Sequence, residues 1–519
     1  MSRDYISGIV RRASETPPDD SSKRFVSREA LIRDLDKQTV TSLLQTSFPE
    51  GSDDANALAM DFVAAAAYIS PPKGACKCRR PRCTGARIIF VTLSLIARED
   101  CIGAFFRSEI CDYDLPYSVK RTPLAHHGGL PSDPQTHLAA CEGAISTPPP
   151  ESQQWSEKEK QLFCHFQWTM LSPYIENTKL ADIKTENFNA EACLPWSEYG
   201  DTLQEECDDT LEDDDQCNLS PSFIRKVKIS REHNNFGDRY LALKGQRSRV
   251  LGWDTFDEEV SGYRRTAVPH ENIVTLLAAF KHSGSNHILL PWAEGGNLED
   301  LWKKYSKPQE PGPAPQIPLW CTSDWVWNQC RGLADGLSFI HGFQAAPGVV
   351  PQLHADIQPR NILCFETKGH DGNPSYTLKI TDFEFSVPFT KPGAIVKIPI
   401  GHEAPTYHPP ENWKYEKVRK QRVHRVSQNW DVWCLGCVYL EFLSWFLYGH
   451  EKGVDRFADE RMAEVHEKDA LEMLNSKRKD QAFFRVMLES PPLIKYLFHS
   501  RRKSVGNTSD YNGTTERTE

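Results

Sequence analysis

The sequence predicts an α+β fold, in which a run of helices is followed by a run of strands and then by further helices. From Ser27 onward, apolar residues recur close to the helical period of about 3.6. At Phe223 this pattern changes abruptly to short runs rich in β-forming residues, separated by turn-like residues. A long amphipathic helix at 325–341 follows these runs. The expected strands are residues 223–229, 239–243, 273–280 and 287–290.

Composition divides the chain into five parts. Residues 1–25 are rich in Ser, Pro and charge, and we expect them to be disordered. Residues 26–190 are expected to form an all-helical module, and residues 191–220 an acidic, flexible segment. The strands and the later helices place a second folded domain at 221–500. The polar tail, 501–519, is expected to be disordered.

Capping patterns mark the helices of the amino-terminal module. Ser27 is suited to cap the first helix. Ser156 and Glu159 form a capping-box pattern, which opens a helix rich in aromatic residues. The module carries no catalytic combination of residues that we recognise. Its later helices are expected at 54–70, 86–99 and 161–171.

An acidic run separates the helical module from the strands. Residues 201–215 hold nine acidic side chains and no Lys or Arg. Such a composition favours a solvated, flexible segment.

Charge and hydropathy exclude several classes of partner. The 519-residue chain is 39% hydrophobic and 25% charged, which is typical of a globular protein. Its formal net charge of −10 argues against nucleic-acid binding. The apolar run at 432–449 is interrupted by Glu441, so we expect a buried helix and no membrane partner. Residues 1–20 lack the apolar run of a secretory signal, so we expect an intracellular protein, cytoplasmic or nuclear.

Fifteen cysteines are spread along the chain, and without an export signal we expect reduced thiols. Cys76, Cys78 and Cys83 form the one tight group, among basic residues. A structural zinc ion needs four ligands, and the nearest His in sequence is His126. An exposed basic loop with ordinary thiols is therefore the favoured interpretation, with zinc binding as the alternative.

The run 354–363, His-Ala-Asp-Ile-Gln-Pro-Arg-Asn-Ile-Leu, carries the clearest chemistry. Asp356 can accept the proton of a hydroxyl group, and the amide oxygen of Asn361 can hold a hard cation such as Mg²⁺. This run resembles the catalytic loop of eukaryotic protein kinases, HRDxKxxN, with Ala355 in place of Arg and Gln358 in place of Lys.

Further motifs of that family occur in the family's order, and together they cover residues 220–450. One such match is a weak signal, but the ordered series is a strong one. The sequence is similar to kinase-like proteins of filamentous fungi, which carry a Pro-Trp-Ala hinge and a helical module ending in a Gln-Trp helix. The matching positions are Lys244 in Leu-Ala-Leu-Lys, Glu259, the hinge-like run 291–298, Asp382 in Thr-Asp-Phe-Glu, and Asp431 in Asp-Val-Trp-Cys-Leu-Gly.

The resemblance implies a bilobal protein kinase-like fold, with its N-lobe ending near residue 293, and binding of ATP and Mg²⁺. Asp356 would take the hydroxyl proton, and Lys244 would position the phosphates. Glu259 would orient Lys244, with Glu258 as the competing candidate. The residues implied in binding are Leu290, Pro291 and Ala293 for the adenine, and Asn361 and Asp382 for the metal.

Three departures from the family pattern leave two functions open. The chain has no Gly from Asp201 to Phe236, where a phosphate-covering loop is expected. Gln358 lacks the positive charge of the Lys that it replaces, and Glu384 replaces a Gly beside the metal. The first hypothesis is a kinase that phosphorylates Ser and Thr of a protein substrate. The alternative is a pseudokinase, a catalytically impaired scaffold that binds nucleotides or protein partners.

Overall fold

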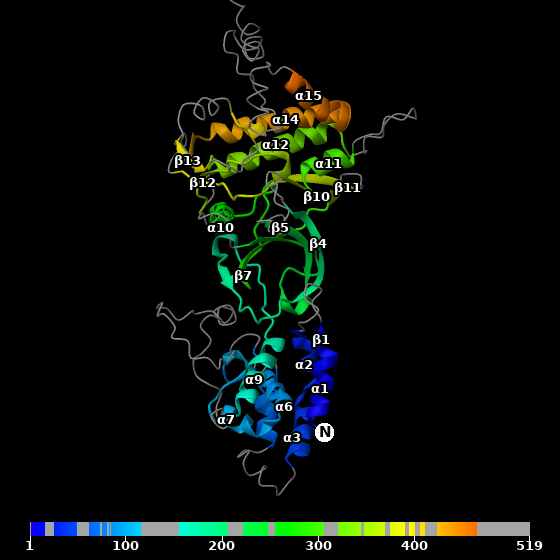
Figure 1. Ribbon diagram of the computed structural model, residues 1–519, viewed down its shortest axis with the longest axis vertical. Coiled ribbons are helices and arrows are strands. Elements are labelled where there is room, and N and C mark those ends of the chain that lie inside the picture. The colour runs from blue at the N-terminus through cyan, green and yellow to red at the C-terminus, as the bar shows by residue number, and fades with distance from the viewer. Residues whose placement is uncertain are drawn as a thin grey trace, which may run out of the picture. The chain divides into compact units, whose positions relative to one another are not determined.

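The computed structural model of the chain divides into two compact units. The first unit comprises Met1–Phe256 and Thr275–Trp292, and the second comprises Asp257–Val274 and Ala293–Glu519 (Figure 1). The structure describes residues 2–15, 25–48, 62–72, 75–79, 83, 85–115, 155–205, 222–247, 255–305, 320–343, 347–368, 374–389, 394–399, 405–409 and 423–463.

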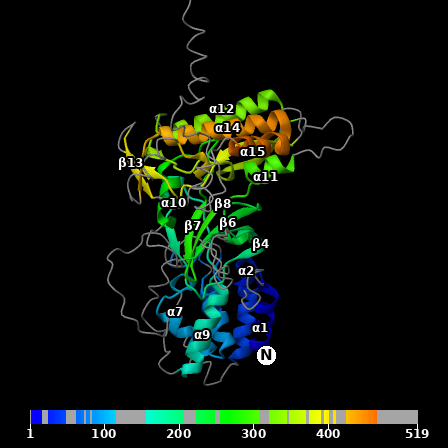
Figure 2. The ribbon, with the colours of Figure 1, turned by 45° about the horizontal axis from the view of Figure 1, so that its top comes forward.

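Helices that pack around a central helix form the first part of the first unit. The central helix, α6, spans Arg87–Leu95, and every one of its residues is buried. A helix buried all round belongs to a hydrophobic core. Figure 2 shows the surrounding helices as one cluster. They are α1 (Ser2–Ala13), α2 (Arg28–Asp34), α3 (Lys37–Ser47), α5 (Phe62–Ile69), α7 (Ile102–Arg107) and α9 (Glu157–Met170).

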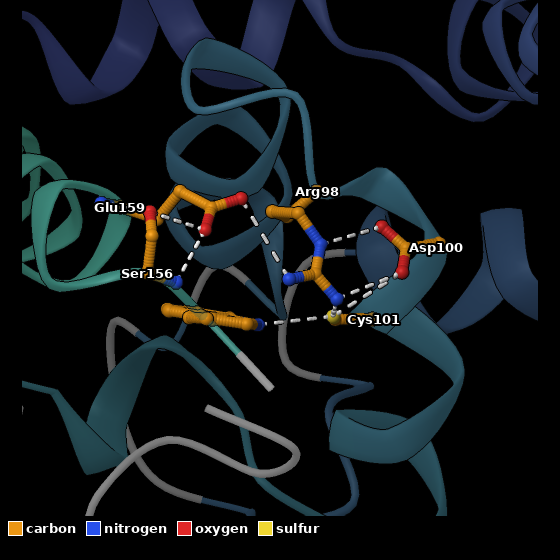
Figure 3. A network of polar contacts seen from close by, with 6 residues as sticks. Arg98, Asp100, Cys101, Ser156 and Glu159 are labelled. Carbon is orange, nitrogen blue, oxygen red and sulfur yellow. Dashed lines mark hydrogen bonds and ion pairs between the residues drawn. The ribbon is translucent and has the colours of Figure 1, made fainter. Parts of the chain in front are cut away.

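The capping residues predicted from the sequence are confirmed. The Ser27 side chain accepts a hydrogen bond from the backbone N–H of Ala30 at the start of α2. Ser156 and Glu159 form the reciprocal capping box at the start of α9. Figure 3 shows that the box continues into an ion-pair network, in which the Arg98 guanidinium lies between Asp100, at 3.1 Å, and Glu159, at 3.7 Å. The cap therefore also fixes α9 against the turn that follows α6.

The expectation of disorder over residues 1–25 is wrong for its first half. Residues 2–13 form α1, with Ile6, Ile9 and Ala13 buried. These residues recur at helical spacing on one face, and the polar residues between them conceal the pattern in the composition. Strand β1 (Ser14–Glu15) then pairs with β2 (Phe25–Val26).

A six-stranded sheet forms the second part of the first unit, in the order β3-β7-β8-β6-β5-β4. All its neighbours are antiparallel except β3, which pairs in parallel with β7 at one edge. The strands are β3 (Thr185–Asn187), β4 (Trp196–Glu205), β5 (Ser222–Ile229), β6 (Leu241–Arg247), β7 (Ala278–His282) and β8 (Ser285–Pro291).

Strand β4 corrects the prediction that residues 191–220 form a flexible segment. Residues 196–205 pair with β5 across several register shifts. An edge strand tolerates charged side chains, because its stability comes from backbone hydrogen bonds and one buried face. Residues 206–221 lie outside the described residues. The sheet also begins before the boundary at 221 that we expected for the second folded domain.

The helical part and the sheet of the first unit meet at the turn between β5 and β6. The backbone N–H of Ile175 donates to the carbonyl of His233 at 2.8 Å, and Phe25 packs edge-on against the His233 ring at 5.7 Å. The Glu232 carboxylate accepts from the backbone N–H of Glu29 at 2.7 Å. These contacts join the module to the strand pair that carries Lys244.

A buried histidine in the sheet core predicts acid sensitivity. His287 stacks on Phe280 at 5.0 Å, and burial lowers its pKa from 6.5 to about 4. Between pH 6.5 and about 4, His287 is protonated in the unfolded chain and stays neutral in the folded chain. Its contribution to the free energy of unfolding is therefore complete above pH 6.5 and declines as the pH falls toward about 4. We expect His287 to lower the free energy of unfolding by about 2 kcal/mol between about pH 7 and about pH 5.

Urea titration of the His287→Phe chain checks this value. Phe removes the titrating group and keeps an aromatic ring beside Phe280, so the difference in stability between the two pH values should shrink by about 2 kcal/mol. The matched control is His165→Phe at an exposed position in α9, which should leave the difference unchanged. An equal pH dependence in the His287→Phe and wild-type chains would contradict the prediction.

The second unit is mainly helical. Helix α14 is long and lies beside α12 in both views (Figures 1 and 2), and α12 confirms the amphipathic helix predicted at 325–341. The Trp445 indole of α14 donates to the Trp302 carbonyl at 3.1 Å. The helices are α10 (Thr255–Arg265), α11 (Leu298–Lys304), α12 (Ser323–Ile340), α14 (Asn429–Gly449) and α15 (Arg456–Ala463). The paired strands are β10 (Ile362–Lys368) with β11 (Pro374–Ile380), β9 (Gln352–Leu353) with β12 (Val387–Pro388), and β13 (Val396–Pro399) with β14 (Val423–Val426).

One helical run in the described part of the chain, Asn429–Arg461, is long and apolar enough to cross a membrane by length and composition. The core helix of a globular domain passes the same test, so this is weak evidence for a membrane span. Its Asp431 and Glu441 are buried and hydrogen-bonded within the unit.

Candidate active site

A buried aspartate at the start of α14 anchors the predicted catalytic loop. Asp431 is fully buried, and its carboxylate accepts hydrogen bonds from the backbone N–H groups of His354 and Ala355, each at 2.8 Å. Nε2 of His341 also lies 2.8 Å from this carboxylate. The Trp430 indole donates to the Ala355 carbonyl at 3.1 Å. Asp431 and Trp430 thus hold the backbone of two consecutive loop residues, and His341 contacts the carboxylate of Asp431.

The histidine of the loop is a buried, neutral connector. Burial lowers the pKa of His354, which is fully enclosed. Its Nε2–H donates to the Thr381 carbonyl at 3.0 Å, and its Nδ1 accepts from the backbone N–H of Asp356 at 3.3 Å. Its ring also packs on Phe383 at 5.0 Å. The imidazole therefore links the loop to the segment that carries Asp382.

Asp356 and Asn361, expected to act together, share a hydrogen-bond network. Nδ2 of Asn361 donates to the Asp356 carbonyl at 2.9 Å and to its carboxylate oxygen Oδ2 at 2.6 Å. Nε2 of Gln358 lies 2.9 Å from both carboxylate oxygens of Asp356. Two side-chain amides therefore orient this carboxylate, and the residue that replaces the family's Lys contacts it directly.

Two residues of this site have a strained backbone conformation. Ala355 has φ 71° and Asp382 has φ 67°, in the left-handed region that non-glycine residues rarely adopt. Such strain persists only where the surroundings hold the residue, and it is frequent at functional sites. Here the carboxylate of Asp431 holds Ala355, and Tyr263 holds Asp382.

Three carboxylates, of Glu259, Asp382 and Glu384, converge at the end of this segment. Their nearest oxygens all lie within 4.8 Å of one another, and Glu259 is fully buried. Its neighbour Glu258 is half-exposed and pairs with Arg265 at 3.1 Å. The structure therefore brings Glu259, and not the competing Glu258, together with the predicted metal ligand Asp382.

Two residues of α10 position this cluster, and both were missing from the predicted site. The Tyr263 hydroxyl lies 2.9 Å from the Thr381 hydroxyl and accepts from the backbone N–H of Asp382 at 3.1 Å. A side chain at Gly262 would place its Cβ 2.4 Å from the Cβ of Phe383, so only glycine allows this approach. Two features of the sequence could have indicated these residues. Tyr263 lies four residues after Glu259, on the same face of a helix, and Gly262 is a glycine inside a helix.

The remaining predicted residues lie on the sheet or directly after it. Lys244 is in β6, and Ala242 is paired in register with Leu290 of β8. Side chains alternate along a strand, so Lys244 and Leu290 lie on one face, opposite the core residues Leu243 and Leu289. Pro291 ends β8, where it is paired with Leu241. Ala293 begins the second unit, and its carbonyl accepts a hydrogen bond from the Gly296 N–H at 3.2 Å.

The chain matches the protein kinase domain family over residues 233–503. It is 26% identical over 169 residues to mitogen-activated protein kinase kinase 1 of Arabidopsis thaliana, covering 33% of this chain and 37% of that protein. It is 25% identical over 220 residues to the mouse serine/threonine-protein kinase Nek3, covering 42% of this chain and 35% of that protein. Rabbit myosin light chain kinase 2, skeletal/cardiac muscle, is 30% identical to the chain over 177 residues, covering 34% of this chain and 23% of that protein.

These matches confirm the predicted α+β, kinase-like fold class. The aligned segments span little more than a third, or less, of the length of each of these relatives.

Proposed function

Because the chain belongs to the protein kinase family, we propose that it transfers the γ-phosphoryl group of ATP to Ser or Thr hydroxyls of a protein substrate. The observation that carries the proposal is the anchored loop, in which Asp356 and Asn361 share one hydrogen-bond network. Similarity to a kinase that bears the name serine/threonine-protein kinase supports the choice of acceptor.

Asp356 acts as the proton acceptor in this proposal. The hydroxyl oxygen of the substrate forms a bond to the γ-phosphorus, the bond from that phosphorus to the leaving ADP oxygen breaks, and the hydroxyl proton passes to Asp356. We assign Oδ1 as the accepting atom, because Oδ2 has the shorter contact with Asn361, at 2.6 Å. A positioned base of this kind contributes about 10²–10⁴-fold to a rate.

The donor atoms of the loop and of the acidic cluster fit a hard divalent cation. Asn361 donates through its amide nitrogen, which leaves its amide oxygen as the atom that would coordinate a metal. Asp382 and Glu384 supply carboxylate oxygens within 4.8 Å of each other, and Mg²⁺ prefers such oxygen ligands. When bound, Mg²⁺ neutralises charge on the phosphates. Asn361 and Asp382 would hold it.

Lys244 and Leu290 form the nucleotide side of the proposal. They share one face of the sheet, which would present the Lys244 ammonium to the phosphates and the Leu290 side chain to the adenine. The carbonyl of Pro291 and the N–H of Ala293 would bind the adenine edge through the backbone.

The acidic cluster favours a second candidate function, an impaired kinase that serves as a nucleotide- or protein-binding scaffold. Glu384 adds a third carboxylate beside Glu259 and Asp382. Like charges this close repel by about 1–4 kcal/mol, depending on screening, and they also repel phosphate oxygens. In this candidate the chain would bind nucleotide or partners without efficient transfer.

Substitution of Gln358 by Lys distinguishes the two candidates. Nε2 of Gln358 lies 2.9 Å from both oxygens of Asp356, so a lysine there brings a positive charge to the position of the present amide. Removing one preorganised donor from an active site lowers the rate by about 10²–10³-fold. Because Gln358→Lys adds such a group, we expect it to raise the rate of phosphoryl transfer from labelled ATP by about 10–10²-fold.

The matched control is Gln358→Met, which keeps the length of the side chain without its hydrogen bonds or charge. We expect no gain of transfer in this variant. If the wild-type and Gln358→Lys chains both bind ATP with Mg²⁺ but transfer no label, the kinase proposal fails and the scaffold candidate stands.

A further inference from the structure

Four cysteine sulfurs meet in the helical part of the first unit. The Sγ atoms of Cys76, Cys78, Cys83 and Cys111 all lie within 4.8 Å of one another. The sulfurs of Cys83 and Cys111 are 3.6 Å apart. Three of these cysteines form the tight group seen in the sequence, and Cys111 supplies the fourth donor that the group lacked.

Backbone contacts hold Cys83 and Cys111 beside the start of α6. The backbone N–H of Asp112 donates to the Gly85 carbonyl at 2.7 Å. The buried Asp112 carboxylate accepts from the N–H groups of Ile88 and Ile89, at 3.1 and 3.0 Å. The residue after Cys111 and the residue two beyond Cys83 are thus tied together, and the two sulfurs are brought close.

Gly85 adds a constraint that only glycine satisfies. Its φ is +84°, and a Cβ at this position would lie 2.2 Å from Pro71 Cδ and 2.7 Å from the Ile69 carbonyl oxygen. The chain between Cys83 and α6 therefore passes directly over the end of α5.

A turn carries the other two cysteines. The N–H of Arg79 donates to the Cys76 carbonyl at 3.0 Å, which closes the turn. Between the cysteines, the Lys77 ammonium lies 3.3 Å from the Glu109 carboxylate and over the Phe106 ring at 5.5 Å. These exposed contacts contribute little stability, but they direct the turn toward the segment that carries Cys111.

We propose that Cys76, Cys78, Cys83 and Cys111 bind one structural zinc ion. Four thiolates at Zn–S distances of about 2.3 Å form a tetrahedron with sulfur–sulfur edges of about 3.8 Å. The sulfurs lie 3.6 Å apart for Cys83 and Cys111 and within 4.8 Å for every other pair, so only small shifts are needed to reach this tetrahedron. Four protein ligands complete the coordination of zinc, as in structural and not catalytic sites.

Local charge supports this assignment. A zinc ion with four thiolates carries a net charge of about −2, and the exposed Lys77 and Arg79 lie in the same turn. The sequence adds Arg80 and Arg82 to this stretch.

Metal analysis of the full chain, purified without a metal-affinity step from zinc-supplemented medium, tests the proposal. We expect one zinc ion per chain in the wild type, and loss of most of it in Cys76→Ser and Cys111→Ser. The matched control is Cys164→Ser in α9, a cysteine outside the cluster, which should retain the metal.

Cobalt substitution keeps the test decisive if the serine variants fail to fold. Wild-type chain stripped of metal and titrated with Co²⁺ should show thiolate-to-cobalt charge-transfer absorption that saturates at one ion per chain and disappears on addition of zinc. A chain that purifies metal-free and gives no such band would overturn the proposal. A Cys83–Cys111 disulfide found in the freshly purified chain, with no bound metal, would overturn it equally.

Discussion

Replacing Asp431 by Ala is expected to lower the free energy of unfolding of the second unit by about 3–5 kcal/mol. The side chain is fully buried, and it accepts from the backbone of His354 and Ala355 while it contacts His341. Ala leaves these polar groups enclosed without their acceptor, and each unsatisfied buried donor costs about 1–3 kcal/mol. Urea titration at neutral pH measures the loss.

Asp335→Ala is the matched control for this substitution. Asp335 lies in α12 of the same unit, its side chain is largely exposed, and it contacts His270 at 3.3 Å. Exposed pairs of this type contribute about 0–1 kcal/mol, so the control should unfold close to the wild type. Equal stability of the Asp431→Ala and Asp335→Ala chains would show that the loop is not anchored through Asp431.

The Asp356→Asn chain is expected to transfer phosphoryl groups about 10²–10⁴-fold more slowly than the wild type. Asn has nearly the same shape, but its amide does not take up the hydroxyl proton that the carboxylate accepts. Binding of ATP should change little, because the proposed nucleotide contacts come from other residues. Initial rates with labelled ATP, together with the dissociation constant of the nucleotide, separate the two effects.

Asp335→Asn controls for the same chemical change at an exposed site of the same unit and should keep the wild-type rate. A thermal unfolding midpoint equal to that of the wild type would confirm that Asp356→Asn is folded. If a folded Asp356→Asn chain transferred label as fast as the wild type, Asp356 would not be the proton acceptor.

The parts of the site that the sequence predicts are those carried by short-range spacing. Asp356 and Asn361 are five residues apart on one loop, and their side chains meet. Lys244 was expected to close a strand over 239–243, and in the structure β6 continues past it to Arg247. Local spacing is reliable here because the chain has little freedom over so few residues.

Contacts between distant segments could not be predicted in the same way. Cys111 lies 28 residues after Cys83, and the contacts of Asp112 with Gly85, Ile88 and Ile89 bring the two sulfurs together. The choice between Glu258 and Glu259 depends on the face of α10 that packs against Phe383, which the helical period alone leaves open. The hydrogen bond from Gln358 to Asp356 was not predicted, because comparison with the family pattern showed only that Gln358 lacks the positive charge of Lys.

The fold prediction failed where stability comes from pairing and not from composition. Residues 2–13 are largely polar, yet Ile6 and Ile9 bury one face of a helix. Residues 196–205 end in acidic side chains, yet they pair with β5. In both cases a few apolar residues or a strand partner outweigh the polar character of the segment.

Transfer of label from γ-labelled ATP to Ser or Thr of a protein acceptor, by the full wild-type chain, tests the central claim most directly. Lys244→Met serves as the reference. We expect label on hydroxyl groups that requires Mg²⁺ and is lost in the reference. Incorporation no greater than that of the reference, by a wild-type chain that binds ATP with Mg²⁺, would contradict the claim that this chain is a phosphotransferase.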